Sequence, residues 1–213
     1  MNKFLFLLVF VFTTVFFKAQ LDTDHWFAPM AAANSGTLRN FTSNLYLSTN
    51  ETTPFRVDVY NNNKFFTTVQ LVKGNPQKIQ IPEEFMVTVN PIEILTPTSK
   101  GLYVKGTKKF FANYRFSVLN HAEIITSKGL AGIGTEFYAA MAPISGTAEY
   151  VNATIGILAT EDNTEVSISN YDSDVVFSNG NTDDDLKVIL NKGQSYIIDA
   201  NSVREQANQA GLI

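Results

Sequence analysis

Five aspartates gather between residues 172 and 185, in a stretch that also carries several asparagines. They are Asp172, Asp174, Asp183, Asp184 and Asp185. Calcium takes six to eight oxygen ligands, and loops rich in Asp and Asn can supply them. The segment is therefore a candidate calcium site, although its spacing matches no EF-hand loop. The alternative is a solvated acidic turn. Calcium is the only cofactor that the sequence suggests.

A second candidate site is a run without acidic residues, from residue 95 to residue 122, in which basic and aromatic side chains interleave. Such a stripe could bind an anionic polysaccharide, with the basic side chains near its acidic groups and the aromatic faces under its sugar rings. The alternative is a hairpin whose lysines face solvent while its phenylalanines fill the core. The candidate ligand-binding residues are Lys105, Lys108, Lys109, Tyr114 and Arg115.

The sequence offers no catalytic signature. His25 and His121 are the only histidines, and a hydrolase triad needs a base beside a nucleophile and an orienting acid. No Gly-x-Ser-x-Gly elbow is present, and no pair of histidines has the spacing of a zinc site. We therefore expect no catalytic residue, and we interpret both histidines as ordinary loop or edge residues.

Short runs of alternating apolar and polar residues must position these side chains. They are separated by turn residues such as Asn61, Asn62, Asn63 and Gly74, which tolerate the positive φ of hairpin turns. This spacing predicts an all-β fold of antiparallel, sandwich-like sheets. The predicted strands cover residues 45–49, 55–60, 65–72, 78–81, 85–89, 102–105, 114–119, 154–159, 165–169, 186–190 and 195–199; a short helix is predicted over residues 201–210.

An internal repeat predicts two modules. The pattern Leu-x-Thr-x-x-x-Thr at residues 47–53 recurs at residues 158–164, and four further anchors recur in the same order. We place a first β module at residues 20–130 and a related second module at residues 131–213. Because the Gly-Leu of residues 101–102 matches residues 211–212, we expect the second module to be incomplete.

The N-terminus predicts export. Residues 1–19 combine Lys3 with an apolar run from Phe4 to Phe17, which is too short to span a bilayer and has the length of a signal-peptide core. No other stretch could span a membrane. The chain has no cysteines, so it needs no disulfide framework, and this composition favours a bacterial exported protein.

The charge balance argues against nucleic acid as a partner. The chain has 16 basic and 20 acidic residues and a net charge of -4. Binding to phosphate backbones requires a basic face, which this composition does not provide.

Four segments carry a family resemblance. They are TSKGL at residues 126–130, GTEFYAA at 134–140, ATIGILATEDNTEV at 153–166 and LNKGQSY at 190–196. They resemble the IgGFc-binding-protein N-terminal-like family, most clearly over residues 121–202. The resemblance implies a large secreted or cell-surface protein; bacterial members are labelled gliding-motility-associated, and many are type IX secretion substrates. The shared residues shape strands and turns, so the resemblance carries over no functional residue.

These observations predict a non-enzymatic secreted or cell-surface module for binding or adhesion, with an extracellular protein or glycan as partner and no cofactor other than calcium. The resemblance and the lack of cysteines point to a Gram-negative bacterium. One alternative is a structural spacer that presents another domain of a large surface protein. A third alternative is a fragment of a carbohydrate-processing enzyme, for which the sequence shows no acid pair.

Overall fold

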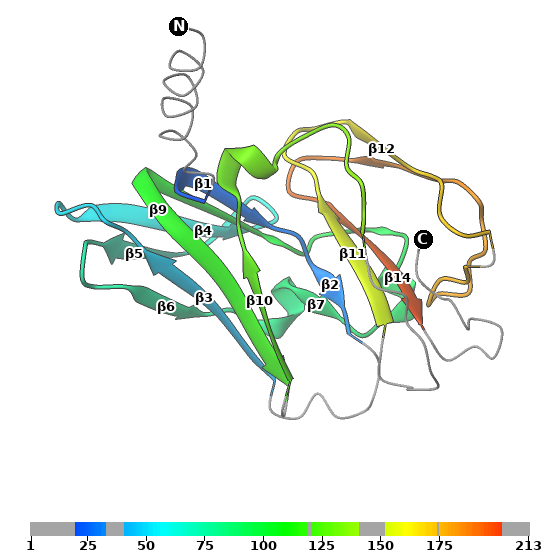
Figure 1. The fold of residues 1–213 in the computed structure, drawn as a ribbon, viewed down its shortest axis with the longest axis horizontal. Helices are drawn as coiled ribbons and strands as arrows, with labels where there is room; N and C mark the ends of the chain where they lie inside the picture. The colour runs from blue at the N-terminus through cyan, green and yellow to red at the C-terminus, as the bar shows by residue number, and fades with distance from the viewer. Residues whose placement is uncertain (1–19, 33–40, 119–120, 141–151, 174, 202–213) are drawn as a thin grey trace, which may run out of the picture.

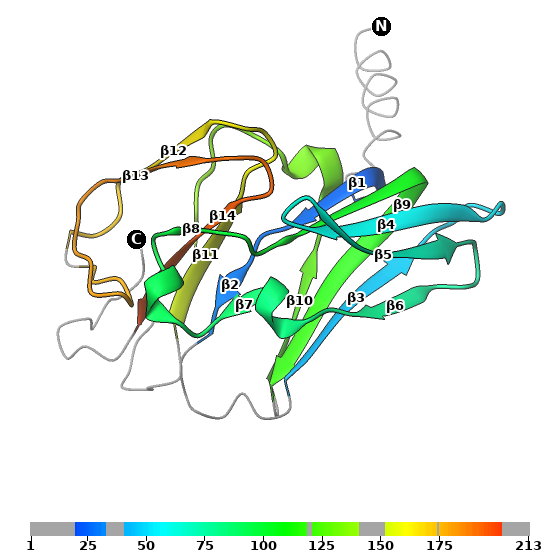
Figure 2. The ribbon, with the colours of Figure 1, turned by 180° about the vertical axis from the view of Figure 1, so that it is seen from behind.

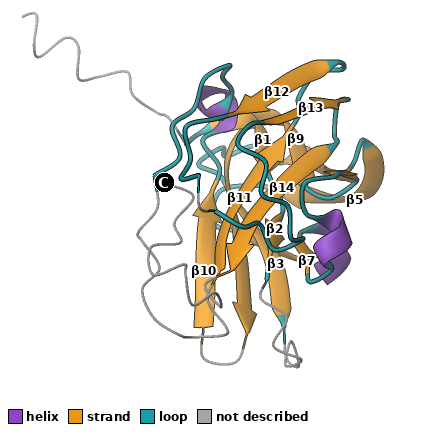
Figure 3. Ribbon diagram, turned by 90° about the vertical axis from the view of Figure 1, so that its right-hand side faces the viewer, coloured by secondary structure: helices purple, strands orange, loops and turns teal. Residues whose placement is uncertain are grey.

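The computed structural model describes residues 20–32, 41–118, 121–140, 152–173 and 175–201, and in this part the chain is built of β-strands and short 3-10 turns (Figures 1 and 3). The all-β prediction is confirmed. The strands are β1 (Asp22–Phe27), β2 (Met30–Ala31), β3 (Thr42–Ser48), β4 (Phe55–Asn61), β5 (Lys64–Leu71), β6 (Gln77–Gln80), β7 (Val87–Thr88), β8 (Pro97–Thr98), β9 (Leu102–Val118), β10 (His121–Thr126), β11 (Asn152–Leu158), β12 (Thr164–Ile168), β13 (Leu186–Leu190) and β14 (Ser195–Asn201). The 3-10 turns are η1 (Glu83–Phe85), η2 (Pro91–Glu93) and η3 (Gly129–Gly132).

The larger sheet is organised around β9, which is 17 residues long. The first half of β9 pairs with β1 and β4, and its second half pairs with β3 and β10, all antiparallel. With β5 beside β4 and β6 beside β3, the strand order is β5-β4-β9-β3-β6. The two halves of the sheet therefore share one central strand, which crosses the whole of the first part of the molecule (Figure 1).

The core of this sheet follows from alternation along the strands. Successive side chains of a strand point to opposite faces, and the inward positions of β9 include Leu102, Val104, Phe110 and Tyr114, all fully buried. The intervening residues point outward, and among them Lys105 is exposed. Burial of the apolar set on one face fixes the register of β9, since a slip of one residue would expose it.

A second, smaller part follows β10. Here β11, β14 and β8 form one sheet, and β12 and β13 form a hairpin beside it (Figure 2). Its own core contains Phe177, Leu190, Tyr196 and Ile198, each at most 4% exposed.

The second sheet draws one edge from the first part of the chain. β8 pairs with β14, and the backbone N–H of Leu95 donates to the carbonyl of Ile197 at 2.9 Å. β11 in turn crosses the segment before β2 so closely that a Cβ on Gly156 would lie 2.0 Å from the carbonyl oxygen of Pro29. Residues that the repeat assigns to the first module thus complete the sheet of the second.

The two four-strand segments of the repeat share one pairing pattern. In the first, β4 and β5 form a hairpin and β3 pairs with β6; in the second, β12 and β13 form a hairpin and β11 pairs with β14. The turns before β6 and β14 each contain a glycine at positive φ, Gly74 at 81° and Gly193 at 79°. Leu47 is buried, whereas Leu158 is only half-buried. The pairing pattern supports the duplication, and the module boundaries stay a prediction.

Several strand predictions differ from the structure. Residues 102–105 and 114–119 belong to one continuous strand, β9, rather than two, and residues 85–89 contain only the end of η1 and the two-residue β7. β1, β2, β8 and β10 are not in the predicted set. The predicted signal segment, Asp174 and the helix over residues 201–210, except its first residue, lie outside the described residues. Over the described ranges, no helix is long and apolar enough to cross a membrane.

Candidate functional site

Four aromatic side chains form a continuous row across the outer face of the larger sheet. Trp26 of β1 is the register partner of Tyr103 of β9, Tyr103 is the partner of Tyr60 of β4, and Tyr60 is the partner of Phe65 of β5. The ring centroids are 5.2, 5.7 and 6.0 Å apart along this series. We call these four residues the aromatic row. It runs from β1 to β5, the two outermost strands of this half of the sheet.

The row faces solvent because each of its strands buries the opposite face. On β1, His25 and Phe27 flank Trp26 and are at most 1% exposed. Trp26, Tyr60 and Tyr103 are half-buried, and Phe65 is 56% exposed. Cross-strand aromatic pairs stabilise a sheet by up to about 1 kcal/mol each, but a monomer gains little from keeping a ring as exposed as Phe65 in solvent.

A row of charged residues lies beside the rings, two positions along each strand. Lys105 is the register partner of both Asp24 and Asp58, so the three side chains follow one another across β1, β9 and β4. The hydroxyl of Tyr103 donates to Oδ1 of Asp24 at 2.5 Å, and Nε of Arg56 donates to Oδ1 of Asp58 at 2.6 Å. Fixed charges and ring hydroxyls therefore border the apolar rings along the outer face.

These contacts determine the protonation of the polar groups. Burial and the neighbouring Asp24 carboxylate raise the pKa of Tyr103, so its hydroxyl stays a neutral donor. Burial alone would raise the pKa of Asp58, but hydrogen bonds from Arg56 and Thr68 outweigh it, and the pKa of Asp58 is lowered. At neutral pH the surface therefore presents the ionised carboxylate of Asp58 and the neutral phenol of Tyr103.

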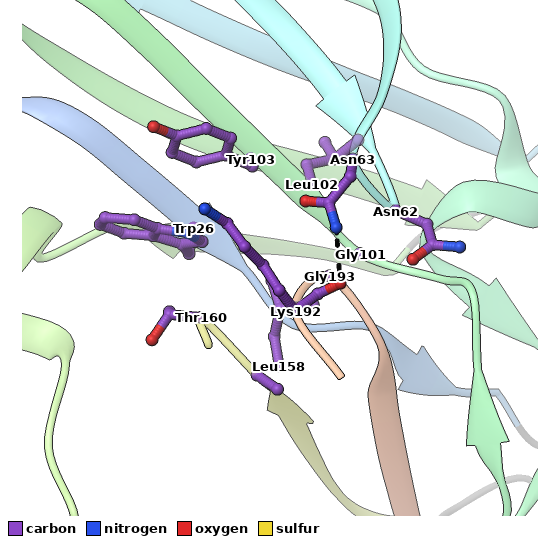
Figure 4. Close-up of a pocket in the computed structure, with 11 residues that line it drawn as sticks. Trp26, Asn62, Asn63, Gly101, Leu102, Tyr103, Leu158, Thr160, Lys192 and Gly193 are labelled. Atoms are coloured by element: carbon purple, nitrogen blue, oxygen red, sulfur yellow. Dashed lines mark hydrogen bonds between the residues drawn. The ribbon is translucent and has the colours of Figure 1, made fainter. Parts of the chain in front are cut away.

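The Trp26 end of the row meets the second part of the molecule at a small notch (Figure 4). The notch is lined by Trp26, Asn62, Asn63, Gly101, Leu102, Tyr103, Leu158, Ala159, Thr160, Lys192 and Gly193. In Figure 4 the indole of Trp26 has Tyr103 on one side and Thr160 on the other, and the side chain of Lys192 extends toward the two rings. The notch has room for about one water molecule, so a larger ligand would lie over it.

His25 lies on the outermost strand β1, as expected of an edge histidine, but its side chain is part of the core. Its ring is fully buried in contact with the ring of Phe110, and Nε2 lies 2.9 Å from the carbonyl oxygen of Phe110. Within the described structure, Nδ1 has no hydrogen-bond partner. This arrangement fits a neutral imidazole that donates from Nε2, and burial lowers the pKa of His25 despite the nearby carbonyls and Asp22. Its role is structural.

The burial of His25 predicts acid sensitivity of the fold. Because the folded-state pKa lies below the unfolded value of 6.5, the unfolded chain binds the proton more tightly. Stability is therefore retained above pH 6.5 and is lost as the pH falls toward the folded pKa, by at most about 1.4 kcal/mol per pH unit. We expect the His25→Gln variant to lose this slope in urea unfolding between pH 7 and pH 5.5. An unchanged slope would assign the acid sensitivity to another group.

The structure divides the predicted basic and aromatic stripe. Lys105 joins the charged row, and Lys109 and Arg115 are exposed farther along β9. Lys108 is half-buried and lies 3.7 Å from a carboxylate oxygen of Glu51. The prediction for Tyr114 is wrong: its ring is fully buried, and its hydroxyl is 2.6 Å from Oγ of Ser43. Tyr114 has the inward parity of β9, so it cannot contact a ligand on the outer face.

The predicted calcium site gains no support from the described residues. Asp183, Asp184 and Asp185 are exposed, and Asp172 is half-buried. No three His, Cys, Asp or Glu side chains of the described ranges converge as metal ligands, and Asp174 lies outside those ranges. Asn181 donates to Oδ2 of Asp183 at 2.7 Å and accepts from its backbone N–H, which is the geometry of an acidic turn. We do not carry calcium forward as a cofactor.

Sequence reasoning missed the aromatic row, although the sequence contains a signal for it. Three of the four aromatics lie two positions from a charged residue on a strand, which places ring and charge on the same, outward face. The pairs are Trp26 with Asp24, Tyr60 with Asp58 and Tyr103 with Lys105. What the sequence does not contain is the register that aligns the four strands.

The fold and the site together describe an all-β module with an ordered aromatic surface. The model of the family described as IgGFc binding protein matches residues 121–211. This match covers β10 to β14 and includes Lys192 of the notch, but none of the aromatic row. No curated protein and no solved structure matches the chain. The match indicates a binding module and specifies no ligand for this chain.

Proposed function

We propose that this chain is a non-enzymatic binding module of an exported or cell-surface protein, and that the aromatic row contacts a carbohydrate ligand. The observation that carries the proposal is the half-exposed series of Trp26, Tyr103, Tyr60 and Phe65, held in register across four strands. The family match over residues 121–211 supports a binding role, and the predicted signal segment supports export of the chain.

The chemistry of the surface suits sugars. A sugar ring has apolar C–H faces and hydroxyls at its rim, and aromatic rings supply large rigid contact area at a low cost in side-chain entropy. The rings of Trp26, Tyr103 and Tyr60 are stacked in series, and Trp26 has one aromatic neighbour, Tyr103, among the described residues. Asp24, Lys105 and Arg56 lie where hydroxyls of a bound chain would find donors and acceptors.

The aromatic row also favours a binding module over the alternative function, a structural spacer. A spacer needs a stable sheet, and cross-strand pairs contribute to that. It does not need a ring that is 56% exposed at the end of the row, as Phe65 is. A contiguous, partly exposed aromatic series is the feature expected of an interaction surface.

Intrinsic fluorescence provides a direct test, because Trp26 is the only tryptophan of the chain. We expect a saccharide identified on a glycan array, or a mucin-type glycoprotein, to change the Trp26 emission in a saturable titration. The Tyr60→Ser/Phe65→Ser double variant should bind about tenfold more weakly, which corresponds to about 1.4 kcal/mol.

The control is Tyr138→Ser, since Tyr138 is 90% exposed and lies outside the row. Its affinity should match the wild type within about twofold. Absence of binding to every saccharide and glycoprotein, by a protein shown to be folded, would favour the spacer. Binding that the double variant retains in full would place the ligand on another surface.

A further inference from the structure

Lys192 is held rigidly at the end of the aromatic row. It lies in the turn between β13 and β14, where its backbone N–H donates to Oδ1 of Asp162 at 3.0 Å and its carbonyl accepts from Nδ2 of Asn63 at 2.6 Å. The next residue, Gly193, donates to the carbonyl of Ala159 at 2.9 Å. Contacts to both parts of the molecule therefore fix the Cα position of Lys192 and leave its side chain free to serve another purpose.

The ammonium group of Lys192 is the one charge of the notch. Lys192 is the only charged residue in the lining described above, and it takes part in none of the ion pairs found among the described residues. Lys100 and Lys108, by contrast, pair with Glu93 and Glu51. The side chain of Lys192 is exposed and extends toward Trp26 and Tyr103 (Figure 4).

The other charged side chains near the row, Asp24, Asp58, Lys105 and Arg56, balance one another in number. Asp58 is paired with Arg56, and Asp24 accepts a hydrogen bond from Tyr103. Lys105 lies between Asp24 and Asp58 in the strand register. A ligand along the row thus meets a surface that is close to neutral. At the Trp26 end it meets the Lys192 ammonium, which forms none of the described ion pairs, although the Asp162 carboxylate accepts from the Lys192 backbone N–H.

We propose that the surface over the notch is a subsite for an acidic group of the bound carbohydrate, a carboxylate or a sulfate, with Lys192 as its counter-charge and Trp26 and Tyr103 as the apolar support of the same sugar. The inference rests on the proposed carbohydrate binding and names its ligand class. Hydrogen bonds between ionised partners are about twice as strong as neutral ones. Because the chain is acidic overall, it has no general attraction for anions that would mask this local effect.

Matched saccharides test the subsite. The probes are oligogalacturonate and its methyl ester, in which a methyl group neutralises the carboxylate, and dextran sulfate and dextran. We expect an anionic probe to bind about tenfold more tightly than its neutral partner by Trp26 fluorescence. Preference within the first pair identifies a carboxylate as the recognised group, and preference within the second pair alone identifies a sulfate.

Three variants assign the preference to Lys192. Lys192→Gln should bring the anionic and neutral probes within about twofold of each other, and Lys192→Arg should retain most of the preference. Lys187→Gln is the matched control, since Lys187 is an exposed lysine on β13 and its loss changes the net charge equally. It should bind as the wild type does.

The outcomes separate this inference from the proposed function. Equal binding of the members of both pairs by the wild type, or a preference that survives Lys192→Gln, overturns the acidic subsite while carbohydrate binding by the row stands. Failure of every saccharide, neutral or acidic, to change the emission of Trp26 overturns both proposals.

Discussion

Replacement of Gly156 by alanine is expected to lower the free energy of unfolding by about 3 kcal/mol, at the upper end of overpacking effects. The new Cβ would lie 2.0 Å from the carbonyl oxygen of Pro29 and 3.0 Å from Cβ of Ala28. Neither atom can move freely, because Met30 is bound through its N–H to the carbonyl of Met86 at 2.9 Å and pairs with β7. Urea unfolding, with the midpoint and slope compared to the wild type, measures the loss.

Gly134→Ala is the control for this substitution. A Cβ at Gly134 would approach only the ring of Phe137, at 3.2 Å, and this ring is 70% exposed and can move away. Its effect should stay within about 0.5 kcal/mol. If Gly156→Ala were equally harmless, β11 would not be packed on the segment before β2 in the way described, and the notch between the two parts would lose its structural basis.

The same two-residue period explains what the sequence could and could not predict about the fold. Alternation identified the strands of both four-strand segments, because each buries one face. It failed for β10, where Ile124 and Ile125 are neighbours and both exposed, 63% and 37%. It also divided β9, because Gly106 and Lys108 interrupt the pattern; Gly106 in fact makes room for the ring of Phe110, which would be 2.8 Å from a Cβ at that position.

The site depended on information that no local pattern contains. Tyr103 and Tyr114 are the same residue type on the same strand, yet Tyr103 faces outward and Tyr114 is fully buried. Tyr103 lies seven positions from the buried Phe110 and Tyr114 lies four, so alternation places the two tyrosines on opposite faces only once β9 is known to be one continuous strand. The alignment of Trp26 with Tyr103 and of Tyr103 with Tyr60 is set by strand pairing over long sequence separations. Sequence reasoning could therefore propose outward aromatics but not assemble them into a row.

Replacement of Trp26 by alanine is expected to have the largest effect on binding, a loss of about a hundredfold in affinity, or about 2.7 kcal/mol. Trp26 stacks on Tyr103 at 5.2 Å and also lines the notch with Lys192, so its removal takes away apolar contact area from the row and from the subsite together. Because the variant has no tryptophan, binding is measured by calorimetry or by retention on an immobilised glycan.

Two further variants make this result interpretable. Trp26→Phe keeps an aromatic ring on Tyr103 and should recover a substantial part of the affinity. If Trp26 were only structural, the affinity of each variant would instead follow its melting temperature. Tyr46→Ala is the matched control, since Tyr46 is a half-buried tyrosine on β3, outside the row, with Nζ of Lys78 6.0 Å from its ring centroid. Its binding should equal that of the wild type. A Trp26→Ala protein that is folded and binds normally would show that the row is not the ligand surface.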